Sequence, residues 1–404
     1  MKKTLAAVAV LGAFAGSALA ADVTLYGRVN LGLNYVHADD GSTTSDSWSL
    51  NSGDATGSRF GLKGSEQISE GLTVGFQLEH GFNADDGSDS SSKAFHRESR
   101  LYVATDYGTL HLGRFGALDS GTGSLDIVGG LTAAGTGYGD IIADQSRVFK
   151  TYSRLDNSIA YVSPEFAGVK VSAMVSLGGG ASKDLRKFTV TPDGVSFGDL
   201  GEGEASSDVD RYYALGVSGQ WGDLGAGLVV SQVDKGNDTY SASFAGNLTD
   251  LEKPELKGSV SHGDDGTNVT AGVNYDFGVA KAYLAGNYYK AGKVVGKSKS
   301  WNVDEDKWET KSTKTDISSW GVSTSVEAPL AAGTFVAAVG YGVTTDDAKA
   351  KDQDTEVLNV GAFYKYPLSK RTYVYAGAGY DQEKPDGKDT KKTYEVISGI
   401  AHQF

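Results

Sequence analysis

The sequence predicts an all-β protein whose strands close into an antiparallel barrel that crosses a membrane. Segments that alternate apolar and polar residues recur from residue 23 to the end of the chain, which is the period of an extended strand. The connections alternate between short turns and long polar stretches, as expected when the two rims of a barrel face different compartments. The clearer strands run about 9–11 residues, enough to cross a bilayer at a tilt.

The first and the last strand together suggest closure. In 23–35, the apolar residues Val23, Leu25, Val29, Leu31 and Leu33 share one face, and Arg28, Asn30 and Asn34 share the other. The terminal segment 394–404 likewise places Tyr394, Val396, Ile400 and Phe404 on one face. A final strand with an open edge would pair with other chains. We therefore expect the two strands to pair and to close the sheet into a cylinder.

Between them we count about sixteen strands, joined alternately by tight turns and by longer connections such as the polar stretch 37–57. The expected strands are 23–35, 58–64, 72–79, 100–103, 109–114, 157–162, 169–177, 212–220, 226–233, 269–277, 280–289, 320–326, 335–343, 357–366, 372–380 and 394–404. Their polar faces carry residues such as Arg28, Asn30, Gln77, Ser218, Thr270, Asn274 and Lys365. These faces are too polar for a packed core, although they would suit the solvated face of a sandwich. A water-filled barrel with an apolar exterior is the better interpretation.

Composition limits the compartment and the partners. The chain has 404 residues, a net charge of −14, 55 glycines, 6 prolines and no cysteine. Residues 1–20 have the basic start, apolar core and Ala18-Leu19-Ala20 ending of a secretory signal peptide. We therefore expect export, cleavage after Ala20, and a mature barrel of residues 21–404 that uses no disulfide. The acidic balance argues against nucleic acid as a partner.

Motifs that would carry enzymatic or metal chemistry are weak. Residues 194–198 match the G-x-S-x-G nucleophile pattern, but we expect them to lie in a loop rather than between a strand and a helix. The six histidines lack metal-ligand spacing, and the acidic clusters lack the full calcium-loop spacing. Bridging of divalent ions to lipopolysaccharide is a minor alternative for these clusters. The sequence predicts no catalytic residue, cofactor site or metal site.

The arginines are more informative. By strand parity, Arg28, Arg59 and Arg154 point to the interior, together with Lys63 and Arg100. Arg114 shares parity with apolar Leu110 and Leu112 and would face lipid, which costs roughly 2–4 kcal/mol at the bilayer midplane. We therefore expect a β-bulge beside it. The alternative is that each arginine pairs with a local carboxylate, but as a group they favour a basic stripe on the inner wall.

The connection from 115 to about 144 differs from the other long connections. It is rich in Gly, Leu, Ile and Ala and has few charges. Loops longer than about 15 residues usually have a function. We expect this apolar loop to fold into the lumen, where it would be buried and would narrow the pore. The alternative is a latch between subunits.

Several motifs together resemble the general porins of Gram-negative bacteria, in particular the trimeric Neisseria-type and related β-proteobacterial porins. They are 23–27, 58–64, 108–114, 156–158, 163–168, 366–372 and the terminal Phe404, and the resemblance covers essentially the whole mature chain. It implies a sixteen-stranded barrel, a homotrimer and a third loop that folds inward. It also implies that basic wall residues face acidic loop residues across a constriction.

On this chain, Arg28, Arg59, Arg114 and Arg154 occupy plausible wall positions. Many porins carry Pro-Glu-Phe-Gly-Gly on the loop, whereas residues 126–130 read Asp-Ile-Val-Gly-Gly and keep only the glycine pair. Asp119 and Asp126 are therefore the candidate loop carboxylates.

The expected function is passive diffusion of ions and small hydrophilic solutes across the outer membrane, with weak anion selectivity. The expected partners are two further copies in a homotrimer, membrane lipid and lipopolysaccharide. One alternative is a channel specific for sugars or organic anions. A sugar channel would need a line of inward aromatic residues, and Tyr26, Tyr102, Tyr212 and Tyr283 have the required parity. A barrel enzyme is a weaker alternative, because no nucleophile and base stand out.

Overall fold

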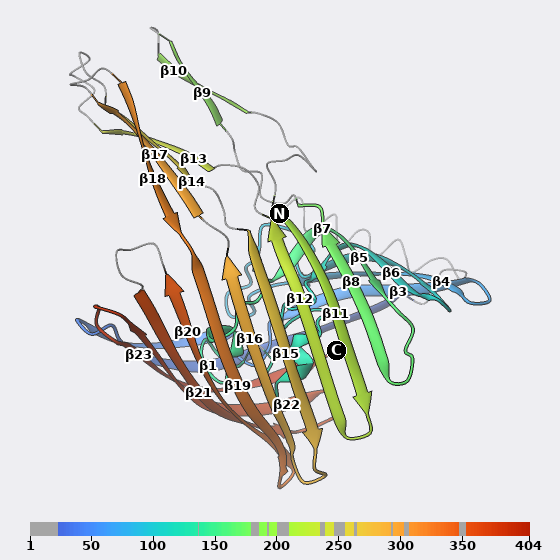
Figure 1. Cartoon of the computed structure of the whole chain (residues 1–404). Coiled ribbons are helices and arrows are strands. Elements are labelled where there is room, and N and C mark those ends of the chain that lie inside the picture. Colours follow the sequence, from blue (N-terminus) through green and yellow to red (C-terminus); the bar gives the residue numbers. More distant parts are fainter. Residues whose placement is uncertain are drawn as a thin grey trace.

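The computed structural model describes most of the chain after the predicted signal peptide, which lies outside the described residues. The described residues are 23–135, 137–178, 186–191, 194–199, 210–234, 239–245, 255–261, 265–291, 294–302, 307–346 and 353–404. They form one large antiparallel sheet and two small sheets (Figure 1).

The large sheet closes on itself as a ring of sixteen strands, as the sequence predicts. Each strand pairs antiparallel with the next one around the ring, and the last pairs with the first. In ring order the strands are β1 (Thr24–Asp39), β3 (Arg59–Ser69), β4 (Leu72–Gly81), β5 (Glu98–Thr105), β6 (Gly108–Gly116), β7 (Arg154–Val162), β8 (Val169–Ser176), β11 (Arg211–Trp221), β12 (Leu224–Asp234), β15 (Gly266–Asp276), β16 (Lys281–Ala291), β19 (Ile317–Leu330), β20 (Gly333–Asp346), β21 (Gln353–Pro367), β22 (Thr372–Pro385) and β23 (Lys391–Gln403).

Closure between the first and the last strand is confirmed. β1 and β23 pair from Arg28 opposite Gln403 to Asp39 opposite Lys392. At the end of this seam, Gly27 and Phe404 exchange two backbone hydrogen bonds of 3.1 Å each. The Phe404 ring lies over Gly27, where a Cβ atom would collide with it. The cylinder therefore has no open edge along β1 or β23.

The expectation that 37–57 is a loop is wrong. β1 continues to Asp39, and β2 (Thr44–Ser52) pairs with it from Leu31 opposite Ser52 to Asp39 opposite Thr44. β2 and β3 pair with the same side of β1, one beyond the other, so β2 extends the second wall strand. The stretch lacks an apolar stripe because most of β2 is exposed. Across the pair, the rings of Tyr35 and Trp48 lie 4.8 Å apart.

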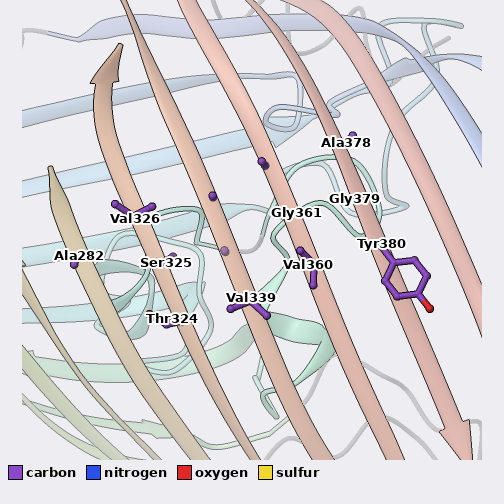
Figure 2. Close-up of a pocket in the computed structure, with 13 residues that line it drawn as sticks. Ala282, Thr324, Ser325, Val326, Val339, Val360, Gly361, Ala378, Gly379 and Tyr380 are labelled. Atoms are coloured by element: carbon purple, nitrogen blue, oxygen red, sulfur yellow. The ribbon is translucent and has the colours of Figure 1, made fainter.

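The two faces of the wall have opposite polarity. Leu33, Leu284 and Val396 are 55%, 52% and 52% exposed on the outer face, whereas the buried inward positions are often polar (Asn30, Asn34, Asn268, Asn287, Asn359 and Glu395). On the outer face, an apolar hollow of about 640 Å³ crosses β16 and β19–β22. Figure 2 shows it from outside, with Val339, Val360 and Tyr380 beside the smaller Ala282 and Ala378. This polarity matches a barrel whose exterior faces lipid.

The small sheets are formed by connections on one side of the barrel. β9 (Arg186–Thr191) pairs with β10 (Gly194–Asp199). β13 (Thr239–Ala245), β14 (Glu255–Ser261), β17 (Val294–Asn302) and β18 (Lys307–Thr315) form a four-stranded sheet in that order. Residues 194–198, expected in a loop, therefore belong to a hairpin strand. Their backbone does not have the strand–turn–helix geometry that the nucleophile motif requires.

The connection 117–153, between β6 and β7, packs against the wall. It contains two 3₁₀ helices, η2 (Val128–Leu131) and η3 (Gln145–Arg147). In one cluster, Leu118 and Val128 pack with inward-facing residues of β7, β8, β11 and β12 (Ala160, Met174, Tyr212 and Val229). In another, Tyr138 and Ile142 pack with Phe363 and Tyr375, and the Tyr138 and Phe363 rings stack at 3.7 Å. No helix in the described part of the chain is long and apolar enough to span a membrane.

Glycines in the wall allow this close packing. A Cβ atom on Gly361 of β21 would collide with the backbone nitrogen of Ala143. A Cβ atom on Gly321 of β19 would collide with the carbonyl oxygen of Val148. Backbone of the connection therefore lies directly on backbone of the wall at two separate places.

We predict that Gly361→Ala weakens this packing, because the added methyl group must displace backbone rather than a flexible side chain. Overpacking of this kind costs typically about 1–3 kcal/mol. The midpoint of denaturant unfolding in detergent micelles should fall relative to wild type. Gly286→Ala is the matched control, since a methyl group there would lie 3.7 Å from the carbonyl oxygen of Gly321, an ordinary contact distance. Equal midpoints for the two variants would contradict the prediction.

Candidate functional site

A group of arginines lines the inner face of the wall on β1, β3–β5 and β7. We call it the arginine wall and define it as Arg28, Arg59, Arg97, Arg100 and Arg154, with the carboxylates Glu79 and Glu98 among them. Five arginines against two glutamates leave a formal excess of three positive charges. Strand parity predicted four of these arginines, and Arg97, which immediately precedes β5, was missed.

Glu79 holds two of the arginines. Its carboxylate lies 2.7 Å from Nε of Arg97 and 3.5 Å from Nε of Arg59. It also accepts a hydrogen bond of 3.0 Å from the hydroxyl of Tyr26. Arg59 donates further to Oγ1 of Thr56 and to the carbonyl of Gly57, in the segment between β2 and β3. Glu79 thus orients the two guanidinium groups but neutralises only one charge.

Arg100 is also held in place. Its Nε lies 3.5 Å from the Glu98 carboxylate, and its guanidinium donates to Oε1 of Gln77 at 2.8 Å. It also lies 3.2 Å from Nδ1 of His111 on the neighbouring strand. Arg100 and Glu98 therefore largely compensate each other.

Arg28 and Arg154 differ from the other members of the wall. Within the described residues, neither side chain forms an ion pair or a hydrogen bond to a carboxylate. Nε of Arg154 is buried and has no hydrogen-bond partner. These two residues carry the uncompensated charge of the wall.

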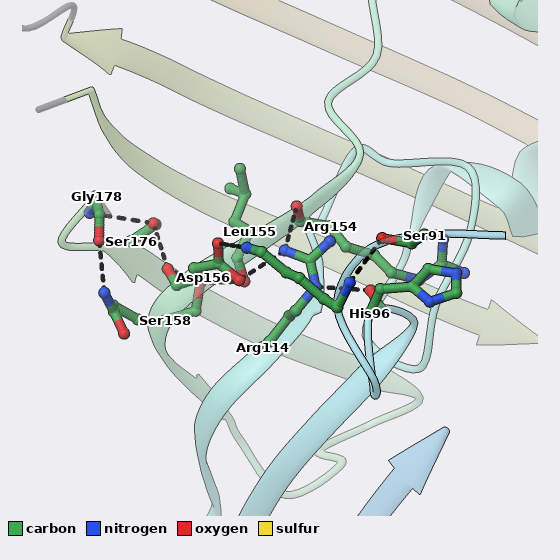
Figure 3. A network of polar contacts seen from close by, with 11 residues as sticks. Ser91, His96, Arg114, Arg154, Leu155, Asp156, Ser158, Ser176 and Gly178 are labelled. Carbon is green, nitrogen blue, oxygen red and sulfur yellow. Dashed lines mark hydrogen bonds and ion pairs between the residues drawn. The ribbon is translucent and has the colours of Figure 1, made fainter. Parts of the chain in front are cut away.

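Arg114 was expected in the arginine wall but pairs with a different set of residues. The register between β6 and β7 shifts between Gly113 and Phe115, which confirms the expected bulge. The guanidinium donates to the Asp156 carboxylate at 2.7 Å and to the carbonyl of His96 at 2.6 Å (Figure 3). Lys93 binds the other oxygen of Asp156 at 2.5 Å. Arg114 is therefore neutralised locally.

Asp119 does not lie beside the arginines. Its buried carboxylate accepts hydrogen bonds from Tyr212 at 2.7 Å, Ser231 at 2.5 Å and Asn268 at 2.9 Å. These donors project from β11, β12 and β15, and burial raises the pKa of the Asp119 carboxyl. Asp119 thus fastens the start of the connection to the wall.

Asp126 does not contact the arginines either. Its carboxylate accepts hydrogen bonds from the backbone nitrogens of Gly121, Val128 and Gly129 at 2.8–3.1 Å. It therefore fixes the turn that leads into η2. Burial raises the pKa of its carboxyl to about 6.

Further wall residues fasten the rest of the connection. Glu395 of β23 accepts hydrogen bonds from the backbone nitrogens of Asp140 and Ile141, and Asp381 of β22 binds Arg147 at 2.7 and 3.1 Å. Asn359 donates to the carbonyl of Ile141 at 2.8 Å. These three anchors were not predicted from the sequence. The sequence feature that could have indicated them is the presence of strongly polar residues at inward positions of long strands.

The described part of the connection presents no carboxylate to the arginine wall. The connection contacts the wall glutamates through the backbone nitrogen of Ser124, which donates a hydrogen bond of 3.1 Å to Glu98. Among the described residues, no cluster of three or more His, Asp or Glu side chains is arranged to hold a metal ion. The site is therefore a basic surface facing a largely neutral one.

A closed barrel with an apolar exterior and a polar, charged interior defines the class of outer-membrane channel proteins. The chain matches the Gram-negative porin family over residues 6–386 and belongs to that family, which confirms the resemblance. It is an integral β-barrel of the Gram-negative outer membrane.

Individual relatives cover nearly the whole chain. An outer membrane porin protein of Bordetella pertussis is 27% identical over 426 residues, covering 100% of both chains. Among solved structures, the anion-selective porin from Comamonas acidovorans is 23% identical with a TM-score of 0.57, over 95% of this chain and 100% of that one. The trimer form of OmpT from Vibrio cholerae is 16% identical with a TM-score of 0.53, over 95% of this chain and 100% of that one. At these identities the structures establish the shared fold.

We predict that Asp119→Ala loosens the connection, because three buried donors lose their acceptor. Each buried polar group left unsatisfied costs about 1–3 kcal/mol. The unfolding midpoint should fall, and trypsin should cleave faster after Arg147 and Lys150 than in wild type. Asp46→Ala serves as the control, since its carboxylate is 60% exposed on β2. Wild-type cleavage rates in Asp119→Ala would contradict the anchoring role.

Proposed function

We propose that this protein is a passive diffusion channel for ions and small hydrophilic solutes that prefers anions. The observation that carries the proposal is the excess positive charge of the arginine wall, in which Arg28 and Arg154 form no ion pair with any described residue. The connection 117–153 narrows the water-filled lumen, and the arginine wall forms the open side of the constriction. Selection then follows from pore size and wall charge.

The anion preference should be stronger than the weak one expected from the sequence. The family resemblance also suggested Asp119 and Asp126 as carboxylates opposite the arginines, where they would balance part of the positive charge. Both carboxylates are instead engaged with the wall or with the connection itself. Low-dielectric surroundings and a narrow lumen increase the effect of each uncompensated charge. The solved Comamonas protein of the same fold is described as anion-selective, which agrees with this assignment.

A channel specific for organic anions is the second candidate, and Arg28 and Arg154 favour it over a sugar channel. A guanidinium group binds a carboxylate through two parallel hydrogen bonds, and in the described part of the chain no carboxylate pairs with Arg28 or Arg154. The sugar alternative needed an accessible line of tyrosines. Tyr212, however, is buried and bound to Asp119, and Tyr26 is bound to Glu79 and Gln77.

We further propose a homotrimer that contacts lipid and lipopolysaccharide and binds no nucleic acid or cofactor. The trimeric form of the Vibrio protein with the same fold supports this assembly, and the apolar outer face supports contact with lipid. We assign no enzymatic activity, because residues 194–198 lie in a hairpin rather than at a strand–helix turn.

The test is the reversal potential of the purified protein in a planar bilayer under a potassium chloride gradient. We expect a chloride-preferring potential, and a several-fold smaller chloride-to-potassium permeability ratio in Arg28→Ala and in Arg154→Ala. Arg114→Ala is the control and should change the ratio less, because Asp156 already neutralises Arg114. A potassium-preferring potential that neither arginine variant alters would contradict the proposal.

A further inference from the structure

Three acidic residues lie where the tip of the connection contacts the wall. They are Asp54, between β2 and β3, Asp140 in the connection, and Glu395 on β23; we call them the carboxylate latch. The backbone nitrogen of Gly139 donates to the carbonyl oxygen of Asp54 at 2.7 Å. The nitrogens of Asp140 and Ile141 donate to the Glu395 carboxylate at 3.0 and 2.9 Å. The latch therefore joins three separate segments of the chain.

Two buried oxygens in the latch have no hydrogen-bond partner among the residues that the structure describes. Asn34 is 1% exposed, and its Nδ2 donates to Glu395 at 2.6 Å, but its Oδ1 is unpaired. Asp54 is 8% exposed, and its Oδ2 is also unpaired. Buried acceptors without a donor are rare and costly. These two unpaired acceptor oxygens indicate that the site lacks a hydrogen-bond donor. A proton bound to the Asp54 carboxyl would supply one.

No described cation compensates the latch. The titratable groups that face Asp54 are Glu395 on β23, Asp140 in the connection and Tyr375 on β22; Asn34 and Asn51 add amide groups from β1 and β2. The arginines that approach the same segment are Arg59, which bonds to Thr56 and Gly57, and Arg97, which lies near Gly57, and both pair with Glu79. Asp54 thus faces other carboxylates without a counter-charge.

We propose that Asp54 is a proton-operated latch residue that fixes the tip of the connection to the wall when its carboxyl is protonated. The proposal rests on the proposed function, in which the connection narrows the pore. A neutral Asp54 removes the repulsion with Glu395 and Asp140 and adds an O–H donor to a site with unpaired acceptors. An ionised Asp54 restores the repulsion across the contact and loosens the tip.

The pH range follows from the direction of the shift. Burial, with a smaller contribution from Glu395 and Asp140, raises the pKa of Asp54 from 3.8 to about 6, although the side-chain amides of Asn51 and Asn34 act to lower it. A raised pKa means that the docked state binds more protons than the undocked state between these values. Docking is therefore most favourable below about pH 4 and weakens as the pH rises through about 6.

We would record single channels of the full-length protein at pH 5 and pH 7.5 and count brief current interruptions caused by movement of the tip. Wild type should show several-fold more interruptions at pH 7.5 than at pH 5. Asp54→Asn, which keeps the shape of the side chain without its charge, should show few interruptions at both pH values. Asp46→Asn, which replaces an exposed carboxylate on β2, should behave as wild type.

Hydrogen exchange of the amides at residues 139–141 gives a second readout that does not depend on conductance. At pH 7.5 these amides should exchange faster in wild type than in Asp54→Asn, and at pH 5 the difference should vanish. Interruptions and exchange that depend on pH equally in wild type and in Asp54→Asn would overturn the latch. Absence of conductance in all proteins would overturn the channel instead, and the exchange experiment would still decide on the latch.

Discussion

The docking of the connection 117–153 onto the barrel interior is the contact on which the pore depends. It places Leu118, Val128 and Ile142 against the wall, where water would otherwise contact them. It also uses buried polar anchors at separated places, of which Asp119, Asp381 and Glu395 are the acidic ones. Apolar burial supplies a non-directional attraction, whereas the hydrogen bonds fix the position of the backbone. A lumen filled with water can therefore contain a segment with a defined conformation.

The same anchors determine the electrostatics of the lumen. A carboxylate that holds the connection in place cannot also balance the charge of Arg28 or Arg154. The acidic residues of the connection and its anchors are thus used for fixation on one side. On the other side, Arg28 and Arg154 form no ion pair with a described carboxylate. If the proposed anion preference holds, structural stability and ion preference depend on the positions of the same small set of carboxylates.

The sequence was sufficient for the barrel because a two-residue period is a local property. It identified every ring strand, the seam between β1 and β23, and the inward direction of Arg28 and Arg59. It missed β2, whose exposed, polar residues carry no apolar stripe. It also misjudged Asp119 and Asp126, because the direction of a side chain in an irregular connection depends on contacts with distant strands. Tyr212, Ser231 and Asn268 lie 93, 112 and 149 residues from Asp119.

The seam between β1 and β23 has a consequence for assembly. Asn34 and Glu395 lie 361 residues apart in the chain and side by side in the wall, so the cylinder cannot close until nearly the whole chain is available. Long-range pairing of this kind is slow, and until it occurs β1 and β23 expose unpaired backbone that other chains can bind. Whether the unclosed chain avoids aggregation therefore depends on how well its two edge strands are shielded until they pair.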